Sequence, residues 1–401
     1  MNLSSGYPFW LIRYGLPYDY PALEENIKTE VVVMGGGISG ALVTWHLVNA
    51  GVKCVVVDAR SIGLGSTCAS TSLLQYEIDT PLCELQHKVG LKNAVSAYKL
   101  CDASINALAK IAAKIKFSEF EKLQSLYFAA FKKDVKFLEK EFKIRNEHGF
   151  DVSLIDEKTI ESSFGFNSPG AILSAQGAQT NAYSFTHALH QDSINKGARV
   201  FDRSRVIKID HTKKGVSLKM LTGCTIKAKT LVYATGYESQ KYIDKKIVDL
   251  NSTFAVCSEQ GDAAGAPFKN RALLWNTADP YLYLRTTADN RILIGGRDES
   301  FYNPLKRDKL LAAKTRQLVY DFNRLYPEVE FKPEFSWCGT FGETKDGLPF
   351  IGPYKKLPNS YFALGFGGNG ITFSLIAAEI LKDLITGNKN ASAEIFSFDR
   401  F

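Results

Sequence analysis

The chain has 401 residues, of which 45 % are hydrophobic and 23 % charged. This is the composition of a folded globular protein, and it excludes the disordered, collagen-like and low-complexity classes. The length predicts two or three domains. The 49 basic and 42 acidic side chains leave a net charge of +7, a mild excess that suits an anionic cofactor but does not indicate a nucleic-acid partner.

The seven cysteines are odd in number and contain no C-x-x-C pair, which argues against a disulfide framework, a zinc ribbon and a thioredoxin-like redox pair. The first residues lack the basic and apolar regions of a secretion signal. No stretch reaches the roughly 18 consecutive apolar residues that a membrane-spanning helix needs. These features predict a soluble, cytoplasmic protein with no integral membrane segment.

Residues 1–28 are rich in aromatic residues and proline, and we expect them to form an arm that packs on the main body. A βαβ pattern follows. It consists of a β-branched strand over 30–34, a glycine cluster, a helix that ends at Gly51 and a buried strand over 52–59. Because the strands of such a unit run parallel with a right-handed crossover, it predicts the start of a parallel sheet.

Later segments alternate between helix and strand. The hydrophobic pattern predicts helices over 83–116, 133–148, 183–196 and 306–325. Period-two runs predict strands within 198–210, 216–221, 224–236 and 253–300, with Asp289-Asn290 as a hairpin turn. Residues 361–386 combine a short strand, a glycine turn and a helix.

Strands and helices typical of a nucleotide-binding domain therefore recur at the beginning, the middle and the end of the chain. This arrangement predicts an α/β fold, α+β overall, with a second domain inserted into a discontinuous Rossmann-type cofactor domain. The predicted ranges are 29–80, 150–240 and 340–401 for the cofactor domain, 81–149 for a helical segment and 241–339 for a substrate domain.

The glycine cluster fits G-x-G-x-x-G and lies between a predicted strand and a predicted helix, the context that a dinucleotide site requires. Gly35 permits the tight turn, Gly37 lacks the Cβ that would block a pyrophosphate, and Gly40 lets the helix lie close to the strand. The helix start, which includes Ile38 and Ser39, presents free N–H groups and a positive dipole end to the phosphates.

An acidic residue follows at the expected distance. Asp58 ends the second strand, 21 residues beyond Gly37, and is flanked by Ala59 and Arg60. A carboxylate at this point accepts hydrogen bonds from a ribose diol and repels a 2′-phosphate.

The next loop distinguishes FAD from NAD. Residues 63–71 supply small hydroxyl and glycine donors for phosphates and an isoalloxazine edge, where a plain NAD dehydrogenase more often continues into another helix. The candidate binding residues in this loop are Gly65, Ser66, Thr67, Ser70 and Thr71. No second G-x-G-x-x-G follows a strand, so the sequence predicts one dinucleotide site, for FAD.

Motifs spread from about residue 30 to 385 resemble one family. They are VVVMGGGISG, Asp58, LGSTCAST, LVYATGY at 231–237, DGLPFIGP at 346–353 and FALGFGGNGITFSLIAAEIL at 362–381. The combination resembles the FAD-dependent amine and amino-acid oxidoreductases typified by D-amino-acid oxidase, glycine oxidase and sarcosine oxidase.

The resemblance implies a glutathione-reductase-like FAD domain and a smaller domain whose antiparallel sheet covers the flavin. It also implies that Thr235 and Gly236 lie near the FAD phosphates or ribityl chain and that the backbone of Val206 meets the adenine. A final set, at a helix start against the flavin ring, comprises Gly367, Gly368, Asn369, Gly370, Ile371 and Thr372. A helix N-terminus there would stabilise the negative charge of a reduced flavin.

The substrate wall is predicted from residues 277–299. If 281–285 is a strand, Tyr281, Tyr283 and Arg285 share one face, and two phenols with a guanidinium suit a carboxylate beside a planar group. Arg297, at the end of the next strand, is the alternative candidate for the cation that binds the substrate. The alternative for each arginine is a place on the rim of a half-solvated sheet.

Several other side chains are candidates for the active site, and each has an alternative explanation as an ordinary surface or core residue. Gln75, Tyr76 and Glu77, and also Glu343 and Lys345, are close enough in sequence to the cofactor motifs to reach the active site, with solvated loop charge as the alternative.

A covalent bond to flavin is considered at Cys338, because the sarcosine oxidase branch carries a cysteine near this point. The spacing to the DGLP segment differs, however, and favours an inert buried thiol and non-covalent FAD. His187 and His190 have no acidic or cysteine partner in the pattern, so no metal site is predicted.

Three functions remain open from the sequence. The favoured one is oxidation of a C–N bond in a small amine or amino acid, by hydride transfer to flavin N5 and hydrolysis of the imine. The alternatives are an FAD-dependent dehydrogenase of a C–OH substrate, such as glycerol phosphate or a 2-hydroxy acid, and a non-catalytic flavoprotein subunit. The electron acceptor, oxygen or another, and the oligomeric state are left undetermined.

Overall fold

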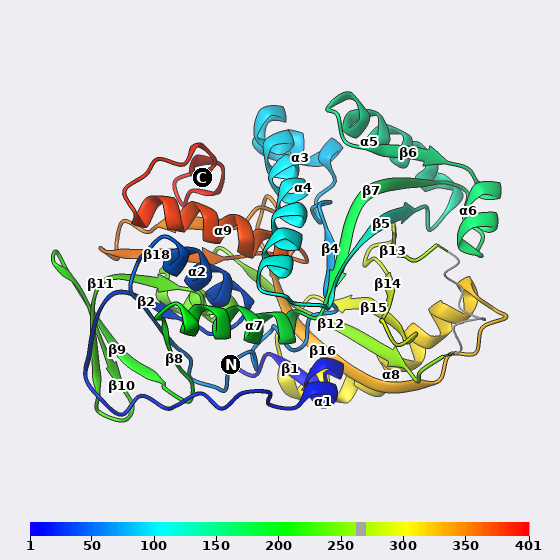
Figure 1. Ribbon diagram of the computed structural model, residues 1–401. Helices are drawn as coiled ribbons and strands as arrows, with labels where there is room; N and C mark the ends of the chain where they lie inside the picture. The colour runs from blue at the N-terminus through cyan, green and yellow to red at the C-terminus, as the bar shows by residue number, and fades with distance from the viewer. Residues whose placement is uncertain (262–269, 401) are drawn as a thin grey trace.

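The computed structural model describes residues 1–261 and 270–400. Two β-sheets lie side by side, with helices on them and between them (Figure 1). Residues 262–269, inside the stretch predicted to hold alternating strands, and residue 401 lie outside the described part. Within that part, no helix combines the length and the apolar character needed to cross a bilayer.

The first sheet has eight strands, five of them parallel, and forms the left half of the view in Figure 1. The parallel strands, in spatial order, are β18 (Ser360–Leu364), β11 (Thr225–Tyr233), β2 (Ile27–Met34), β3 (Cys54–Val57) and β8 (Arg199–Phe201). Antiparallel strands complete it: β17 (Phe350–Pro353) at one edge, and β9 (Val206–Thr212) and β10 (Gly215–Met220) joined to β11.

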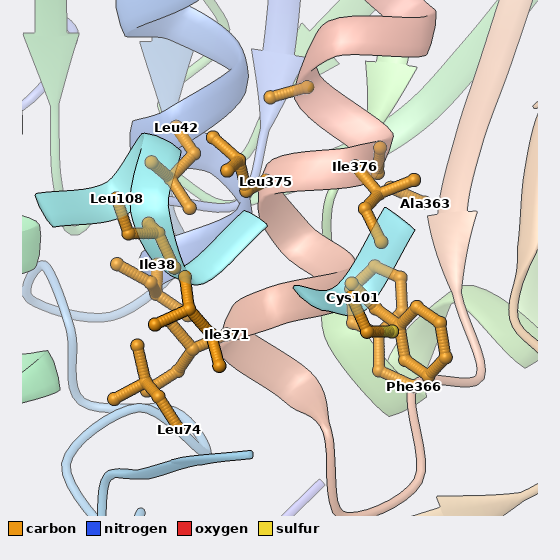
Figure 2. Packing of buried hydrophobic residues seen from close by; sticks show 14 of the residues in the cluster. Ile38, Leu42, Leu74, Cys101, Leu108, Ala363, Phe366, Ile371, Leu375 and Ile376 are labelled. Atoms are coloured by element: carbon orange, nitrogen blue, oxygen red, sulfur yellow. The ribbon is translucent and has the colours of Figure 1, made fainter. Parts of the chain in front are cut away.

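Alternation along β2 gives this sheet two buried faces. Val31 and Val33 belong to one apolar cluster, and Val32 and Met34 belong to another. Helix α2 (Ile38–Asn49) packs against α7 (Ala182–Asn195) and α9 (Gly370–Ile385), and α4 (Leu91–Lys114) packs on α9. Figure 2 shows the side chains that fill the space where α2, α4 and α9 meet, among them Leu42, Leu108 and Leu375.

The second sheet has ten strands and is antiparallel except where β13 meets β5. Its path runs through β1 (Ser4–Gly6), β16 (Pro333–Glu343), β12 (Asp249–Ser258), β15 (Ile292–Glu299), β14 (Tyr283–Thr286), β13 (Ala272–Asn276), β5 (Phe120–Phe128), β7 (Ala171–Thr180) and β4 (Leu73–Gln75), with β6 (Val152–Ile155) paired to β7. The predicted turn at Asp289-Asn290 does join β14 to β15, and Asn290 takes the left-handed conformation with φ 59°.

Five further helices complete the described fold, together with three 3₁₀ turns. The helices are α1 (Phe9–Tyr14), α3 (Leu82–Val89), α5 (Val135–Glu147), α6 (Glu157–Phe164) and α8 (Pro304–Leu325). The 3₁₀ turns are Lys132–Asp134, Gly236–Tyr242 and Ala391–Phe396. The single helix predicted over 83–116 is in fact two, because Gly90 at φ 80° ends α3 before α4 begins.

The distribution of strands between the two sheets differs from the predicted domain ranges. Strands β6 and β7, expected within the cofactor range 150–240, pair in the second sheet, and so does β4. The segment 81–149 is not purely helical, because β5 lies within it. Residues 4–6 of the predicted arm form β1 on the edge of β16. These pairings join segments distant in sequence, which local patterns do not reveal.

Candidate active site

Four neighbouring parallel strands of the first sheet end at the same edge. Met34 of β2 lies beside Val57 of β3 and Tyr233 of β11, and β18 continues the row. Ligands of open α/β sheets bind at this carboxyl edge. A cavity of about 450 Å³ lies there, bounded on its far side by strands β12, β14, β15 and β16 of the second sheet. The site is therefore formed between the two sheets.

The glycine turn after β2 is packed so closely that side chains are excluded. A Cβ on Gly35, which has φ 112°, would lie 2.3 Å from the carbonyl oxygen of Ala234. A Cβ on Gly40 would lie 1.9 Å from the carbonyl oxygen of Gly35. Behind the turn, Nε2 of His190 lies 3.1 Å from the carbonyl oxygen of Gly36. Helix α2 thus begins directly at the cavity, with its positive end facing it.

The carboxylate of Asp58 is fixed beside this turn. One of its oxygens accepts a hydrogen bond from the N–H of Gly36 at 2.7 Å, and the other accepts from the N–H of Arg60 at 2.8 Å. A carboxylate has about four acceptor positions, so both oxygens retain capacity for a ribose diol. The Arg60 guanidinium lies 3.1 Å from Glu238, and both side chains line this end of the cavity.

Nearly all the residues predicted to bind the cofactor line this one cavity. They are Gly35, Gly37, Ile38, Ser39, Asp58, Ala59, Arg60, Gly65, Ser66, Thr67, Ser70, Thr71, Val206, Thr235, Gly236, Gly367, Gly368, Gly370 and Ile371.

Three of the predicted residues lie behind the wall instead. Gly40 packs on the turn, the Asn369 amide donates to the carbonyl of Glu77 at 2.8 Å, and the Thr372 hydroxyl donates to the carbonyl of Asn369 at 2.9 Å. These three therefore support the wall and do not form it.

The donor set fits FAD. A side-chain-free turn and a helix start suit the diphosphate, and Asp58 suits the ribose. At the other end of the cavity, the start of α9 presents Gly367 and Gly368. A Cβ at either glycine would approach the Asp79 carboxylate to 2.7 Å or less, so this stretch of backbone can pack against Asp79 only because side chains are absent.

Two phenols line the cavity near the start of α9. The hydroxyl of Tyr281 donates to Oδ1 of Asp79 at 3.1 Å, and the N–H of Gly368 donates to Oδ2 of Asp79 at 2.6 Å. The hydroxyl of Tyr283 lies 3.2 Å from that of Thr253. The two rings stand 5.8 Å apart, as the predicted shared face requires. Burial raises the pKa of both phenols, so both are neutral at physiological pH.

Arg285 lies on the predicted face but not in the cavity. Its guanidinium donates to the carbonyl oxygens of Thr71, Ser72 and Thr180 at 3.2, 2.9 and 2.9 Å. It also lies 5.3 Å from the ring of Trp10, and burial lowers its pKa to about 9. Arg285 therefore holds the loop whose other side lines the cavity, and the predicted carboxylate clamp at this residue is wrong.

We expect Arg285→Met to destabilise the protein, since three buried carbonyls lose their donor. The expected loss in free energy of unfolding is about 1–3 kcal/mol, measured by chemical denaturation. The exposed Arg316 on α8 gives the control, Arg316→Met, with an expected change within about 0.5 kcal/mol. Equal effects of the two substitutions would contradict this role.

Arg297 also points away from the cavity, for a different reason. A β-bulge separates the pairs Phe254–Gly296 and Ser252–Glu299, and Arg297 takes φ 57°. The extra residue reverses the alternation of β15. The Arg297 guanidinium consequently meets the Asp321 carboxylate of α8 at 2.6 and 2.5 Å, and Asp298 faces the cavity in its place. The predicted role of Arg297 on the substrate side is therefore wrong.

Asp79, Thr253 and Asp298, which lie at this end of the site, were not among the predicted residues. A signal for Asp298 was present, because the pair Gly295-Gly296 within a strand indicates a bulge. A Cβ on Gly295 would lie 2.3 Å from the Tyr283 ring, so this glycine also makes room for that phenol.

Of the other candidates, only Gln75 lines the cavity. Tyr76 and Glu77 are buried behind it, and Glu77 forms an ion pair with Arg145. Glu343 and Lys345 are not part of the wall. In the described residues, no cluster of three His, Cys, Asp or Glu side chains could hold a metal ion.

Cys338 lies on the opposite face of β16 from the cavity. Its neighbours Trp337 and Gly339 line the cavity, whereas Cys338 packs in an apolar cluster with Phe254 and Leu318. Burial raises the pKa of this thiol to about 12, so it is un-ionised. The geometry agrees with non-covalent FAD.

We therefore expect acid or heat denaturation to release all yellow colour from the polypeptide. Cys338→Ser is expected to leave the FAD content unchanged, as measured from the ratio of absorbance at the flavin and protein bands. Flavin that stays with the denatured wild-type chain and is lost from the serine variant would contradict this assignment.

Comparison with known proteins agrees with the geometry. The family model described as DAO, FAD dependent oxidoreductase, matches residues 30–384. The glycine oxidase of Bacillus licheniformis is 23 % identical over 93 % of this chain and 98 % of its own length. The gamma-glutamylputrescine oxidoreductase of Escherichia coli K12 is also 23 % identical, over 96 % and 90 %. The crystal structure of glycine oxidase from Geobacillus kaustophilus superimposes with a TM-score of 0.79 at 18 % identity, covering 94 % of this chain and all of that one.

Proposed function

Since the chain belongs to the DAO family of FAD-dependent oxidoreductases, we propose that it oxidises a C–N bond of a small amine or amino acid. When bound, FAD supplies the two-electron acceptor that takes hydride from the carbon next to nitrogen, leaving an imine that water hydrolyses. The observation that carries the proposal is the cavity between the sheets, in which a dinucleotide cradle opens onto a wall of phenols and a carboxylate. The names of two relatives, a glycine oxidase and a gamma-glutamylputrescine oxidoreductase, support the same bond type.

Residues at the two ends of the cavity would have different roles, in binding the cofactor and in positioning the substrate. The glycine turn, Asp58 and the start of α2 would hold the diphosphate and the ribose. The start of α9, with Gly367 and Gly368, would offer backbone N–H groups and a positive dipole to the ring system. Tyr281 and Tyr283 would position the substrate and exclude water from the reacting carbon.

The test is an anaerobic screen of the FAD-loaded protein. Amines, amino acids, 2-hydroxy acids and glycerol phosphate are mixed with it in turn, and the flavin absorbance is followed. Bleaching by an amino compound, with ammonia or an amine released, is the expected result. Bleaching by hydroxy compounds alone, or by no compound, would overturn the proposal. Readmitting oxygen and assaying peroxide then identifies the electron acceptor.

A further inference from the structure

We propose that Asp298 receives the cationic amino group of the substrate and takes its proton, and that the site selects an amine with no carboxylate beside the reacting carbon. The inference deepens the proposed function and rests on it. It follows from the position of one carboxylate, from the charges around it and from the chemistry that an amine requires.

The position of Asp298 is set by the fold. The bulge in β15 turns its side chain into the cavity, on the wall that holds Tyr281, Tyr283 and Thr253. Oδ1 of Asp298 is buried and has no hydrogen-bond partner among the described residues. Burying a carboxylate oxygen without a donor costs free energy, so the Asp298 carboxylate, whose side chain lines the cavity, is suited to a donor that a ligand brings.

The titratable groups around Asp298 are predominantly carboxyls. Burial is the main cause that raises the pKa of Asp298 to about 7, and the nearby carboxyls of Asp79 and Glu343 add to the shift, whereas a hydrogen bond with Thr253 and the charge of Lys314 act in the opposite direction. The Lys314 ammonium is itself engaged, because it donates to the carbonyl of Arg297 at 2.8 Å and to Glu299 at 2.6 Å. This end of the cavity therefore attracts a cation.

The basic side chains of the described wall lie at the opposite end. They are Arg60, Arg205 and Lys241. Arg60 and Lys241 flank Glu238, and the residue before Arg205 donates its N–H to the carbonyl of Asp58. With Arg285 and Arg297 both turned away, the described wall offers a substrate carboxylate no cation beside the phenols. An amino acid would bring its carboxylate next to Asp79 and Asp298, which like-charge repulsion disfavours.

The proposed contact also accounts for the proton that must leave. A substrate amine arrives as an ammonium ion, and its nitrogen needs a free electron pair before the neighbouring C–H bond can release hydride. One N–H bond breaks, its electron pair stays on nitrogen, and the proton forms an O–H bond with the carboxylate of Asp298. The raised pKa of Asp298 makes its carboxylate a better acceptor for this proton than an ordinary aspartate would be.

The test uses ligands that cannot react. tert-Butylamine and 2-aminoisobutyrate both lack hydrogen on the carbon next to nitrogen, and only the second carries a carboxylate. Binding to the FAD-loaded protein is measured by calorimetry and by the shift of the flavin absorption spectrum. We expect tert-butylamine to bind at least tenfold more tightly than 2-aminoisobutyrate. Tighter binding of 2-aminoisobutyrate would overturn the selectivity.

Asp298→Asn tests the residue, with Glu299→Gln as the matched control, since Glu299 pairs with Lys314 outside the cavity. We expect the asparagine variant to keep its FAD content and melting temperature, and to bind tert-butylamine at least tenfold more weakly. The control is expected to bind it as the wild type does. Unchanged binding by the asparagine variant, or equal weakening in both, would overturn the proposal.

A pH series provides a second readout. Because the folded pKa of Asp298 lies near 7, the carboxylate is present above that pH, so the affinity of the wild type for tert-butylamine should fall about tenfold per unit below it. The asparagine variant should lack this dependence, and retention of it would count against Asp298.

The outcome is separable from that of the proposed function. If tert-butylamine binds through Asp298 but no compound of the screen bleaches the flavin, the binding site stands and the C–N oxidation fails. If amino acids bleach the flavin and tert-butylamine does not bind, the oxidation stands and the role of Asp298 fails.

Discussion

Gly40→Ala is expected to lower the affinity for FAD at least ~100-fold. The added Cβ would lie 1.9 Å from the carbonyl oxygen of Gly35, and neither atom belongs to a flexible side chain that can move aside. Helix α2 must therefore shift against the turn that presents its N-terminus to the diphosphate. Overpacking a rigid site costs about 1–3 kcal/mol or more, and about 1.4 kcal/mol corresponds to a tenfold change in affinity. Fluorescence titration of the apoprotein with FAD measures the effect.

Gly170→Ala gives the matched control. A Cβ at Gly170 would meet its nearest neighbour at 3.8 Å, which is ordinary contact, and the residue does not line the cavity. We expect this variant to bind FAD as the wild type does. If Gly40→Ala also retained wild-type affinity, the close packing of the turn would not be what shapes the diphosphate site.

Arg145→Met is expected to lower the free energy of unfolding by about 3–5 kcal/mol. The Arg145 guanidinium lies 2.7 Å from Glu141 and 3.4 Å from Glu77, and all three side chains are fully buried. Removing the cation leaves two carboxylates in a low dielectric without their counter-charge, which is more costly than loss of the pair itself. Thermal and denaturant unfolding measure the change.

The pH dependence provides a check on the cause. In the variant, burial raises the folded pKa of both carboxyls, so their neutral forms are favoured and the destabilisation should shrink as the pH falls. Lys143→Met on the same helix is the control, because Lys143 and Glu147 form an exposed pair whose loss should cost at most about 0.5 kcal/mol. A destabilisation of Arg145→Met that does not vary with pH would contradict the electrostatic explanation.

The residues on the cofactor side of the site could be predicted because they belong to short sequence motifs. The glycine turn, Asp58 and the loop of small residues are short motifs whose function depends on backbone shape, and they line the same cavity in the structure. The family fold followed from these motifs and from the second glycine motif before α9.

The substrate side could not be predicted to the same degree. A single bulge in β15 exchanges Arg297 for Asp298 at the cavity, because side chains alternate with a period of two. The position of Arg285 depends on carbonyls of Thr71, Ser72 and Thr180, which are distant in sequence. Strands β5 and β7 were not predicted, and their pairing with each other is likewise non-local.

The pairing of β1 with β16 has a consequence for the order of assembly. Strand β1 must wait for a partner that is synthesised more than 300 residues later, and α9 follows later still. Each sheet contains strands from early and from late parts of the sequence. Neither sheet can therefore form completely before the late strands have been synthesised. Because the start of α9 lines the cavity, the coenzyme site is incomplete until α9 has been synthesised.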